Sequence, residues 1–216
     1  AFNQFPDNDL ISQRLATAYQ RSNRINEAIQ RYEQVIQNNP SNVFAYLNVV
    51  SLYRMVASET TDTALANQMY ARAIETMNRL RAIQPENGLV YLNLASIYLA
   101  QNNNTEADNN ARTAISKDPS LYQAYIIQAM VQQARGTTKY NEFIDLEKRA
   151  AAAVGRQATT LSRDRDAAKT AAATHFRSAD ELLKAARSRT SDPEVTKDIN
   201  ARLTRVAQLL SQATAY

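Results

Sequence analysis

The sequence contains one histidine, His175, and no cysteine, which leaves few side chains for catalysis. His175 lies among alanines in a stretch with helical periodicity and precedes Phe176, so we interpret it as a packed or solvated residue. No glycine-rich phosphate loop, zinc-ligand spacing or paired-carboxylate motif occurs, and without cysteine there are neither disulfides nor thiolate metal sites. We therefore expect no enzyme, no metal, no cofactor and no small-molecule substrate. We therefore look for function in the contacts that the surface of the chain can make.

Four of the five prolines are regularly spaced: Pro6, Pro40, Pro85 and Pro119 are separated by 34, 45 and 34 residues. Proline ends helices because it lacks an N–H and disfavours helix in the residue before it. A period in this range predicts stacked helix–turn–helix units, each of which buries its apolar face against its neighbours. The chain has only three glycines, which favours long helices over turn-rich β structure.

Other residues recur with the prolines in a fixed order: a bulky residue, a pair that is bulky then small, an aromatic residue, a small residue and a bulky residue. The first set lacks the leading bulky residue and consists of Leu15, Ala16, Tyr19, Ala28 and Tyr32. The other two sets are Tyr46, Val49, Val50, Tyr53, Ala73 and Met77, then Tyr91, Leu94, Ala95, Tyr98, Ala107 and Ala111. This order resembles the tetratricopeptide repeat signature over about residues 1–135. Ala16 and Ala95 replace its usual glycine, and Ala111 replaces its usual bulky residue.

The resemblance implies an all-α fold, a right-handed solenoid of stacked helix–turn–helix units with additional C-terminal helices. We expect residues 1–8 to be the stub of a partial repeat, 9–135 the solenoid, and 136–216 helices that pack on it. The solenoid divides into units 9–42, 43–87 and 88–121, with the start of a fourth at 122–135. In that fourth unit Gln128 and Gln132 replace the expected leucine and tyrosine.

The second unit is eleven residues longer than the others, around 58–68. Asp62 is a plausible N-cap, so we expect the second helix of this unit to begin at residue 63 and to extend beyond the stack. The extension is either a tolerated insertion or a protruding contact element.

In the C-terminal part, helical periodicity predicts helices over 140–158, after Gly136, and over 163–189. A last helix starts at Asp192-Pro193-Glu194, an N-cap followed by proline and an acidic residue in the first turn.

In tetratricopeptide stacks, the first helices of the repeats line a concave groove that holds extended peptides or a helix. By this resemblance the groove residues are Gln13, Thr17, Phe44, Leu47, Asn48, Ser51, Leu89, Leu92, Asn93, Ser96, Ile126 and Met130. The basic residues of the family's peptide clamp for a terminal carboxylate are missing, since Leu47, Leu89 and Leu92 stand at comparable places. A mostly apolar groove with two amides fits an apolar helix or an extended strand, because asparagine both donates and accepts hydrogen bonds. Alternatively, the C-terminal helices of the chain fill this groove themselves.

These patterns predict a non-catalytic scaffold for protein–protein interaction. One form of it is head-to-tail self-assembly into a homo-oligomer or filament, because a solenoid without polar caps leaves different apolar faces at its two ends. Phe2 and Phe5 would then dock near Leu203, Val206 and Leu210 of the next subunit. The alternative is a monomeric adaptor that binds a peptide or helix in its groove.

Charge argues against a nucleic-acid partner. Residues 1–134 carry 10 Lys and Arg against 11 Asp and Glu, and residues 135–216 carry 15 against 10, with the signs alternating at 163–166. Alternating signs indicate a solvated helix face with ion pairs, so a nucleic-acid-binding accessory protein is the less favoured alternative. No apolar run is long enough to span a membrane. The start at Ala1 favours a mature extracytoplasmic or secreted form, although a cut through a longer repeat array would start in the same way.

Overall fold

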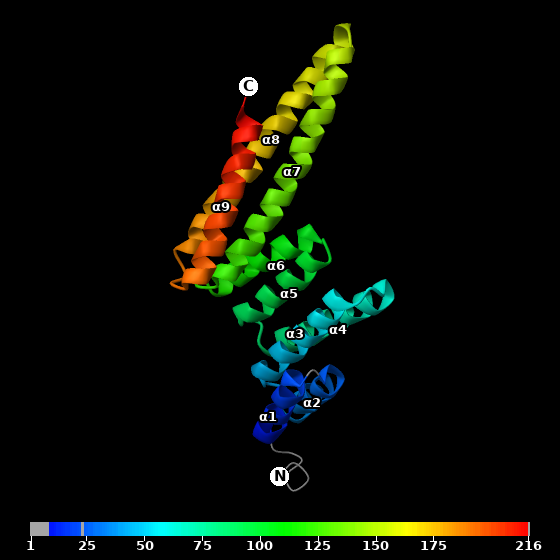
Figure 1. Ribbon diagram of the computed structural model, residues 1–216, viewed down its shortest axis with the longest axis vertical. Helices are drawn as coiled ribbons and strands as arrows, with labels where there is room; N and C mark the ends of the chain where they lie inside the picture. Colours follow the sequence, from blue (N-terminus) through cyan, green and yellow to red (C-terminus); the bar gives the residue numbers. More distant parts are fainter. Residues whose placement is uncertain (1–8, 23, 216) are drawn as a thin grey trace. The chain divides into compact units, whose positions relative to one another are not determined.

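The computed structural model describes residues 9–22 and 24–215, the side chains of 9–13 and 20 excepted, and these residues form helices and connecting turns without a strand. In chain order the helices are α1 (Asp9–Arg21), α2 (Ile25–Asn38), α3 (Val43–Glu59), α4 (Thr63–Ile83), α5 (Gly88–Ala100), α6 (Asn104–Lys117), α7 (Tyr122–Ala152), α8 (Gly155–Arg187) and α9 (Pro193–Thr214). The expected all-α solenoid with additional C-terminal helices is confirmed (Figure 1). The chain divides into two compact units between Asn102 and Asn103, inside the predicted third repeat.

The first unit stacks consecutive helices from α1 to α5, and its core includes repeated residues from all three sets. Tyr32, Tyr46 and Tyr53 are buried, and the alanines at the helix crossings, Ala28 and Ala73, have no exposed surface. Small residues at these positions let paired helices approach closely while the tyrosines fill the space to the next pair. The Tyr53 hydroxyl of α3 also donates a hydrogen bond to Glu33 of α2, which joins one repeat to the next.

The long second repeat is an extended helical hairpin. Helix α4 begins at Thr63 as expected, because the Asp62 carboxylate accepts hydrogen bonds from the backbone N–H groups of Ala64 and Leu65. Helix α3 is lengthened as well: it has 17 residues, against 13 in α1 and α5. The inserted residues therefore lengthen both helices of the pair.

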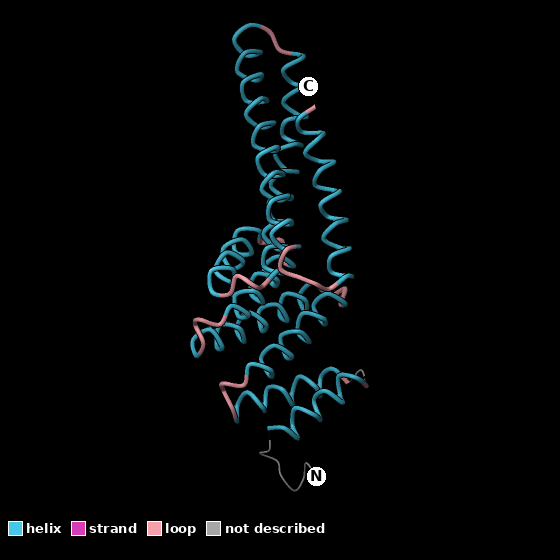
Figure 2. The backbone as a smooth tube through the Cα atoms, turned by 90° about the vertical axis from the view of Figure 1, so that its left-hand side faces the viewer, coloured by secondary structure: helices cyan, strands magenta, loops and turns pink. Residues whose placement is uncertain are grey.

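The second unit contains α6 to α9. Helix α7 has 31 residues and α8 has 33, and the two run side by side in opposite directions, with α9 packed along α8 (Figures 1 and 2). The predicted start of α9 is confirmed, because Asp192 caps the N–H groups of Glu194 and Val195.

The expected helix boundary near Gly136 is wrong, because α7 runs through this residue without a break. Gly136 is buried, and a Cβ atom placed on it would lie 2.7 Å from Cε1 of Phe176 on α8. This glycine thus serves close helix packing and not chain reversal. The reversal comes later: α7 ends at Ala152, and Gly155 has a φ of +61°, which glycine adopts without steric cost. The predicted ranges 140–158 and 163–189 therefore place the boundary between these two helices too late in the chain.

The Gly136–Phe176 contact predicts the opposite of the usual effect of replacing a helical glycine with alanine. Alanine gains about 1 kcal/mol of helix propensity, but forcing a methyl group against a buried ring costs about 1–3 kcal/mol. We expect Gly136→Ala to lower the free energy of unfolding in urea. Thr137→Ala, at the neighbouring exposed position, is the control and leaves stability almost unchanged. A Gly136→Ala protein more stable than the parent would show that α7 and α8 are not in close contact here.

Candidate protein-interaction surface

One face of α3 presents an apolar strip with an exposed aromatic ring. Phe44, Leu47, Asn48 and Ser51 follow one another at helical spacing, and Phe44 is 49% exposed. The Phe44 ring meets the buried Tyr32 ring of α2 edge-on, with centroids 6.2 Å apart and planes inclined by 66°. Leu47 is half-buried against the core of the first unit. An exposed ring that is held in place by contact with a buried aromatic ring is preorganised to bind an apolar partner.

The two predicted amides have the same local geometry on α3 and α5. Asn48 Nδ2 donates to the Phe44 carbonyl at 2.8 Å, and Asn93 Nδ2 donates to the Leu89 carbonyl at 2.8 Å. These bonds hold each amide on its own helix and use one of its two N–H donors. The other N–H and the Oδ1 acceptor of each amide have no hydrogen-bond partner among the described residues and can bind a ligand backbone.

The remaining groove residues of the first unit differ in accessibility. Leu89 and Ser96 are half-buried, but Leu92 is only 9% exposed and offers a partner little surface. The Thr17 hydroxyl of α1 lies 3.2 Å from the Tyr32 hydroxyl, so Tyr32 connects Thr17 with Phe44. The side chain of Gln13 lies outside the described residues.

Ile126 and Met130 belong to α7 in the second unit. Ile126 is half-buried against the cluster formed with α8 and α9, and Met130 is 37% exposed. The C-terminal helices thus cover part of this face of α7.

The predicted self-assembly face needs a correction. Val206 has no exposed surface because it lies in the core between α8 and α9, and Leu203 and Leu210 are half-buried in the same core. Val206 therefore cannot receive an aromatic ring from another subunit while α9 is packed on α8. Phe2 and Phe5 lie outside the described residues.

A buried acidic residue that the sequence analysis did not single out joins α6 to α7. Asp108 accepts hydrogen bonds from Arg135 Nη1 at 2.8 Å, from Gln128 Nε2 at 3.2 Å and from Arg112 Nε at 3.2 Å. Burial raises the pKa of Asp108, but the hydrogen bonds from Arg135 and Arg112 outweigh it and hold that pKa below its ordinary value of 3.8. The glutamine that interrupts the repeat signature at 128 is thus part of a polar network.

His175 takes part in a second polar contact, between α8 and α7. Its Nδ1 lies 2.8 Å from Oε1 of Gln132, the other residue that departs from the signature. Burial, together with the positive charges of Arg135 and Lys139, lowers the pKa of His175. Its environment favours a neutral, structural histidine. No cluster of three or more metal-ligating side chains occurs in the described part of the chain.

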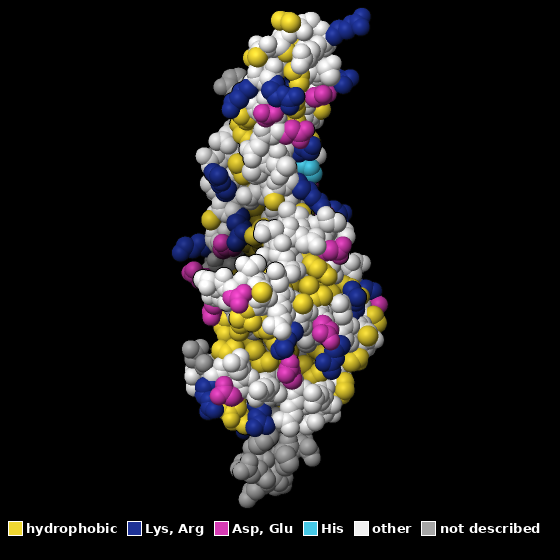
Figure 3. Space-filling view, turned by 90° about the vertical axis from the view of Figure 1, so that its right-hand side faces the viewer, with side chains coloured by type: hydrophobic (Ala, Val, Ile, Leu, Met, Phe, Trp, Pro, Cys, Tyr) yellow, Lys and Arg dark blue, Asp and Glu magenta, His cyan; other side chains and the backbone are white. Residues whose placement is uncertain are grey.

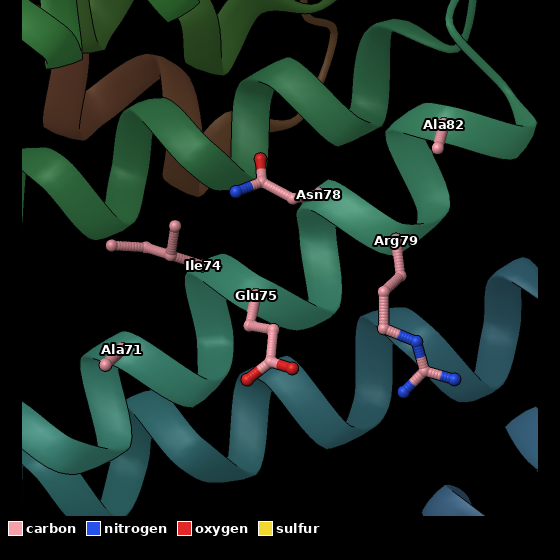
Figure 4. Close-up of a pocket in the computed structure, with 6 residues that line it drawn as sticks. All are labelled: Ala71, Ile74, Glu75, Asn78, Arg79 and Ala82. Atoms are coloured by element: carbon pink, nitrogen blue, oxygen red, sulfur yellow. The ribbon is translucent and has the colours of Figure 1, made fainter.

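A hollow of 600 Å³ lies on α4 and is lined by Ala71, Ile74, Glu75, Asn78, Arg79 and Ala82 (Figure 4). Figure 4 shows Ile74 and Asn78 pointing to one side of the helix, and Glu75 and Arg79 to another. Residues from a single helix give this hollow few convergent polar groups.

The basic residues of α7 to α9 are mixed with acids along the surface, as Figure 3 shows for one face of α7 and α8. Ion pairs join Arg149 to Asp145, Arg163 to Asp164, Arg165 to Asp166, Lys184 to Asp180 and Arg202 to Asp198. These acids reduce the positive potential that a phosphate backbone would need. None of the helices in the described ranges combines the length and the apolar character needed to cross a bilayer.

Comparison with known families finds tetratricopeptide repeat models that match residues 13–42 and 64–130. Among solved structures, the chain is similar to the MamA protein, with 14% identity over 95% of this chain and 91% of that chain and a TM-score of 0.50. It is also similar to a putative protein binding protein from Bacteroides ovatus ATCC 8483, with 15% identity, coverage of 94% and 99%, and a TM-score of 0.51. A tetratricopeptide repeat protein from Parabacteroides merdae ATCC 43184 has 19% identity, coverage of 95% and 73%, and a TM-score of 0.50. At these identities the likeness shows the fold. No curated protein matches the sequence.

The Asp108 network predicts a loss of stability when its charge is removed. Asp108→Asn should lower the free energy of unfolding at pH 7 by about 1–2 kcal/mol, since it removes charge-assisted hydrogen bonds. The expected loss is limited because Arg112 is 63% exposed and keeps its hydration. Because the folded pKa is lowered, the advantage of the parent is complete above pH 3.8 and disappears as the pH falls through the folded value.

Urea unfolding at pH 7 and in acid measures both effects. Asp145→Asn is the matched control, because Asp145 is 66% exposed in its ion pair with Arg149 and should change stability by less than about 0.5 kcal/mol. Equal stabilities of the two variants would contradict a structural role for the Asp108 network.

Proposed function

Because the chain belongs to the tetratricopeptide repeat family and is a scaffold for protein–protein interaction, we propose that it binds its partner on the exposed faces of α3 and α5. Tetratricopeptide repeat proteins are generally non-catalytic adaptors, and we propose the same for this chain. The partner is a protein segment, either a helix or an extended strand.

The exposure of Phe44 carries this proposal. A phenylalanine that is 49% exposed next to Leu47, with Asn48 one turn away, combines an apolar anchor with a hydrogen-bonding group. Full burial of an aromatic side chain contributes about 1.5–3 kcal/mol, and interfaces concentrate their binding energy in such anchors. Asn93 on α5 repeats the amide of Asn48, so a ligand backbone would have two equivalent hydrogen-bonding positions.

Self-assembly is the second form of this scaffold that we propose, with identical subunits as partners. It is supported by the repeat architecture, in which each unit presents different faces to its two neighbours. The contact cannot use Val206, which is buried. Light scattering of the purified protein over a range of concentrations separates the two forms: a constant monomer mass favours the adaptor, and a mass that rises with concentration favours the polymer.

Binding to nucleic acid through α7 to α9 is the less favoured alternative, because ion pairs along these helices offset part of their basic excess and mix the two signs of charge. A salt titration tests this directly. Tight binding to DNA or RNA at low salt, with a steep loss as salt rises, would contradict the proposal of a protein partner.

Site-specific photo-crosslinking at Phe44 tests the proposed surface in the cells that produce the protein. A photoreactive phenylalanine analogue at position 44 should cross-link to a defined protein, because the native ring is part of the interface. The same analogue at Ile83 on α4 is the matched control, since Ile83 is 47% exposed but lies on a different helix. We expect Phe44→Asp to reduce the affinity for the cross-linked protein at least about tenfold, and Ile83→Asp to leave it unchanged.

Helix content and thermal unfolding of both variants show whether the fold is intact. Equal cross-linking at positions 44 and 83, or undiminished binding by a folded Phe44→Asp variant, would refute the α3 surface.

A further inference from the structure

A pocket of 410 Å³ in the first unit contains an arginine that has no hydrogen-bond or ion-pair partner among the described residues. The pocket is lined by Ser51, Arg54, Met55 and Ser58 of α3, Tyr70 of α4 and Ala100 of α5. Arg54 is half-buried, and within the described chain its guanidinium has neither an ion pair nor a hydrogen bond. Burial lowers the pKa of Arg54, while the nearby Tyr70 hydroxyl has the opposite effect. An arginine remains charged in proteins, so this pocket contains a positive charge that no acidic side chain of the described residues pairs with.

The polar groups around this charge suit an anionic oxygen. Ser51 has no hydrogen-bond partner among the described residues, so its hydroxyl is free to donate, whereas the Ser58 hydroxyl donates to the Met55 carbonyl at 2.9 Å. The other walls, Met55 and Ala100, are apolar. A guanidinium and a hydroxyl above an apolar wall match a carboxylate at the end of an aliphatic stem.

The pocket is continuous with the proposed partner surface, because Ser51 lies both on the exposed face of α3 and in the pocket wall. A segment bound over Phe44 can therefore place one of its side chains in the pocket. One cation balances one carboxylate, whereas a dianionic phosphate would require further charge.

A glutamate side chain suits these walls, because its methylenes would contact the apolar Met55 and Ala100 while its carboxylate meets Arg54. A chain terminus would instead bring a polar backbone N–H against the same apolar atoms.

We propose that the Arg54 pocket binds the side-chain carboxylate of a glutamate in the partner segment. The partner is thus an apolar segment that carries an acidic residue, which defines more closely the class of protein that the exposed face of α3 takes. This inference rests on the proposed function where it assigns the glutamate to a segment bound on α3. Binding of a carboxylate in the pocket is tested separately, without a partner protein.

The test is an NMR titration of the full chain with small probes, observed at the Arg54 Nε–H and at the backbone amides of residues 51–58. N-acetylglutamate α-amide should shift these signals saturably, with a Kd on the order of millimolar for a ligand of this size. N-acetylglutamine α-amide, the neutral isostere, should bind at least about tenfold more weakly, because it cannot form the charge-assisted bonds. Arg54→Gln should abolish the shifts, and Arg79→Gln should not, since Arg79 is an exposed arginine of the hollow on α4.

Three results would overturn the assignment. The first is equal affinity for the glutamate and glutamine probes. The second is unchanged binding in a folded Arg54→Gln protein. The third is binding of N-acetylleucine as tight as that of the glutamate probe, which would show that the pocket takes a chain terminus. The outcome is independent of the cross-linking at Phe44. If Phe44→Asp loses the partner but the glutamate probe causes no shifts, the pocket alone is rejected. If the glutamate probe binds but Phe44→Asp keeps the partner, the α3 surface alone is rejected.

Discussion

Each helix in the described part of this protein buries its apolar face chiefly against the helix next to it in the chain. A helix–turn–helix repeat cannot bury that face alone, so stability comes from the contact between consecutive repeats. Small residues such as Ala28 and Ala73 allow the close approach, and Tyr32, Tyr46 and Tyr53 fill the space between repeats. Since packing uses only part of each helix, the face of α3 that carries Phe44 is left for a partner.

The same constraint explains why the repeat signature ends in the second unit. At Gln128 and Gln132 the chain replaces apolar contacts with hydrogen bonds to Asp108 and His175. Gly136 leaves room for the ring of Phe176, so α8 packs closely on α7 at this point. The two helices form a long antiparallel hairpin. A buried network of this kind adds geometric specificity to apolar packing, because each of its members needs its partner. The lowered pKa of Asp108 reflects that requirement.

The elements that obey a local rule could be predicted from the sequence. Asp62 and Asp192 start helices because their carboxylates cap free N–H groups. Tyr32, Tyr46 and Tyr53 are buried because their spacing places them on the packed faces of their helices. No local rule applies to Gly136, because a glycine either interrupts a helix or makes room for a neighbour, and the sequence alone does not distinguish the two. The chain reverses at Gly155, which has a positive φ.

The candidate surface was predictable only in part. The resemblance selects the residues that face a groove, but it does not indicate that Leu92 and Val206 are buried. Val206 lies in a core that α8 and α9 form together. Asp108 pairs with Arg135, 27 residues away, and no local pattern indicates such a contact. The sequence does mark Arg54, because it is the one charged residue of α3 before Glu59.

We propose that a protein partner covers the faces of α3 and α5 that carry Phe44 and Asn93, and hydrogen exchange of the backbone amides can detect this contact. The exchange is measured for the protein alone and for its complex with the partner cross-linked at Phe44. We expect slower exchange in residues 43–58 and 88–97 of the complex, with unchanged exchange in 163–187 of α8. Slower exchange confined to α8 and α9, with α3 and α5 unchanged, would show that the partner binds elsewhere.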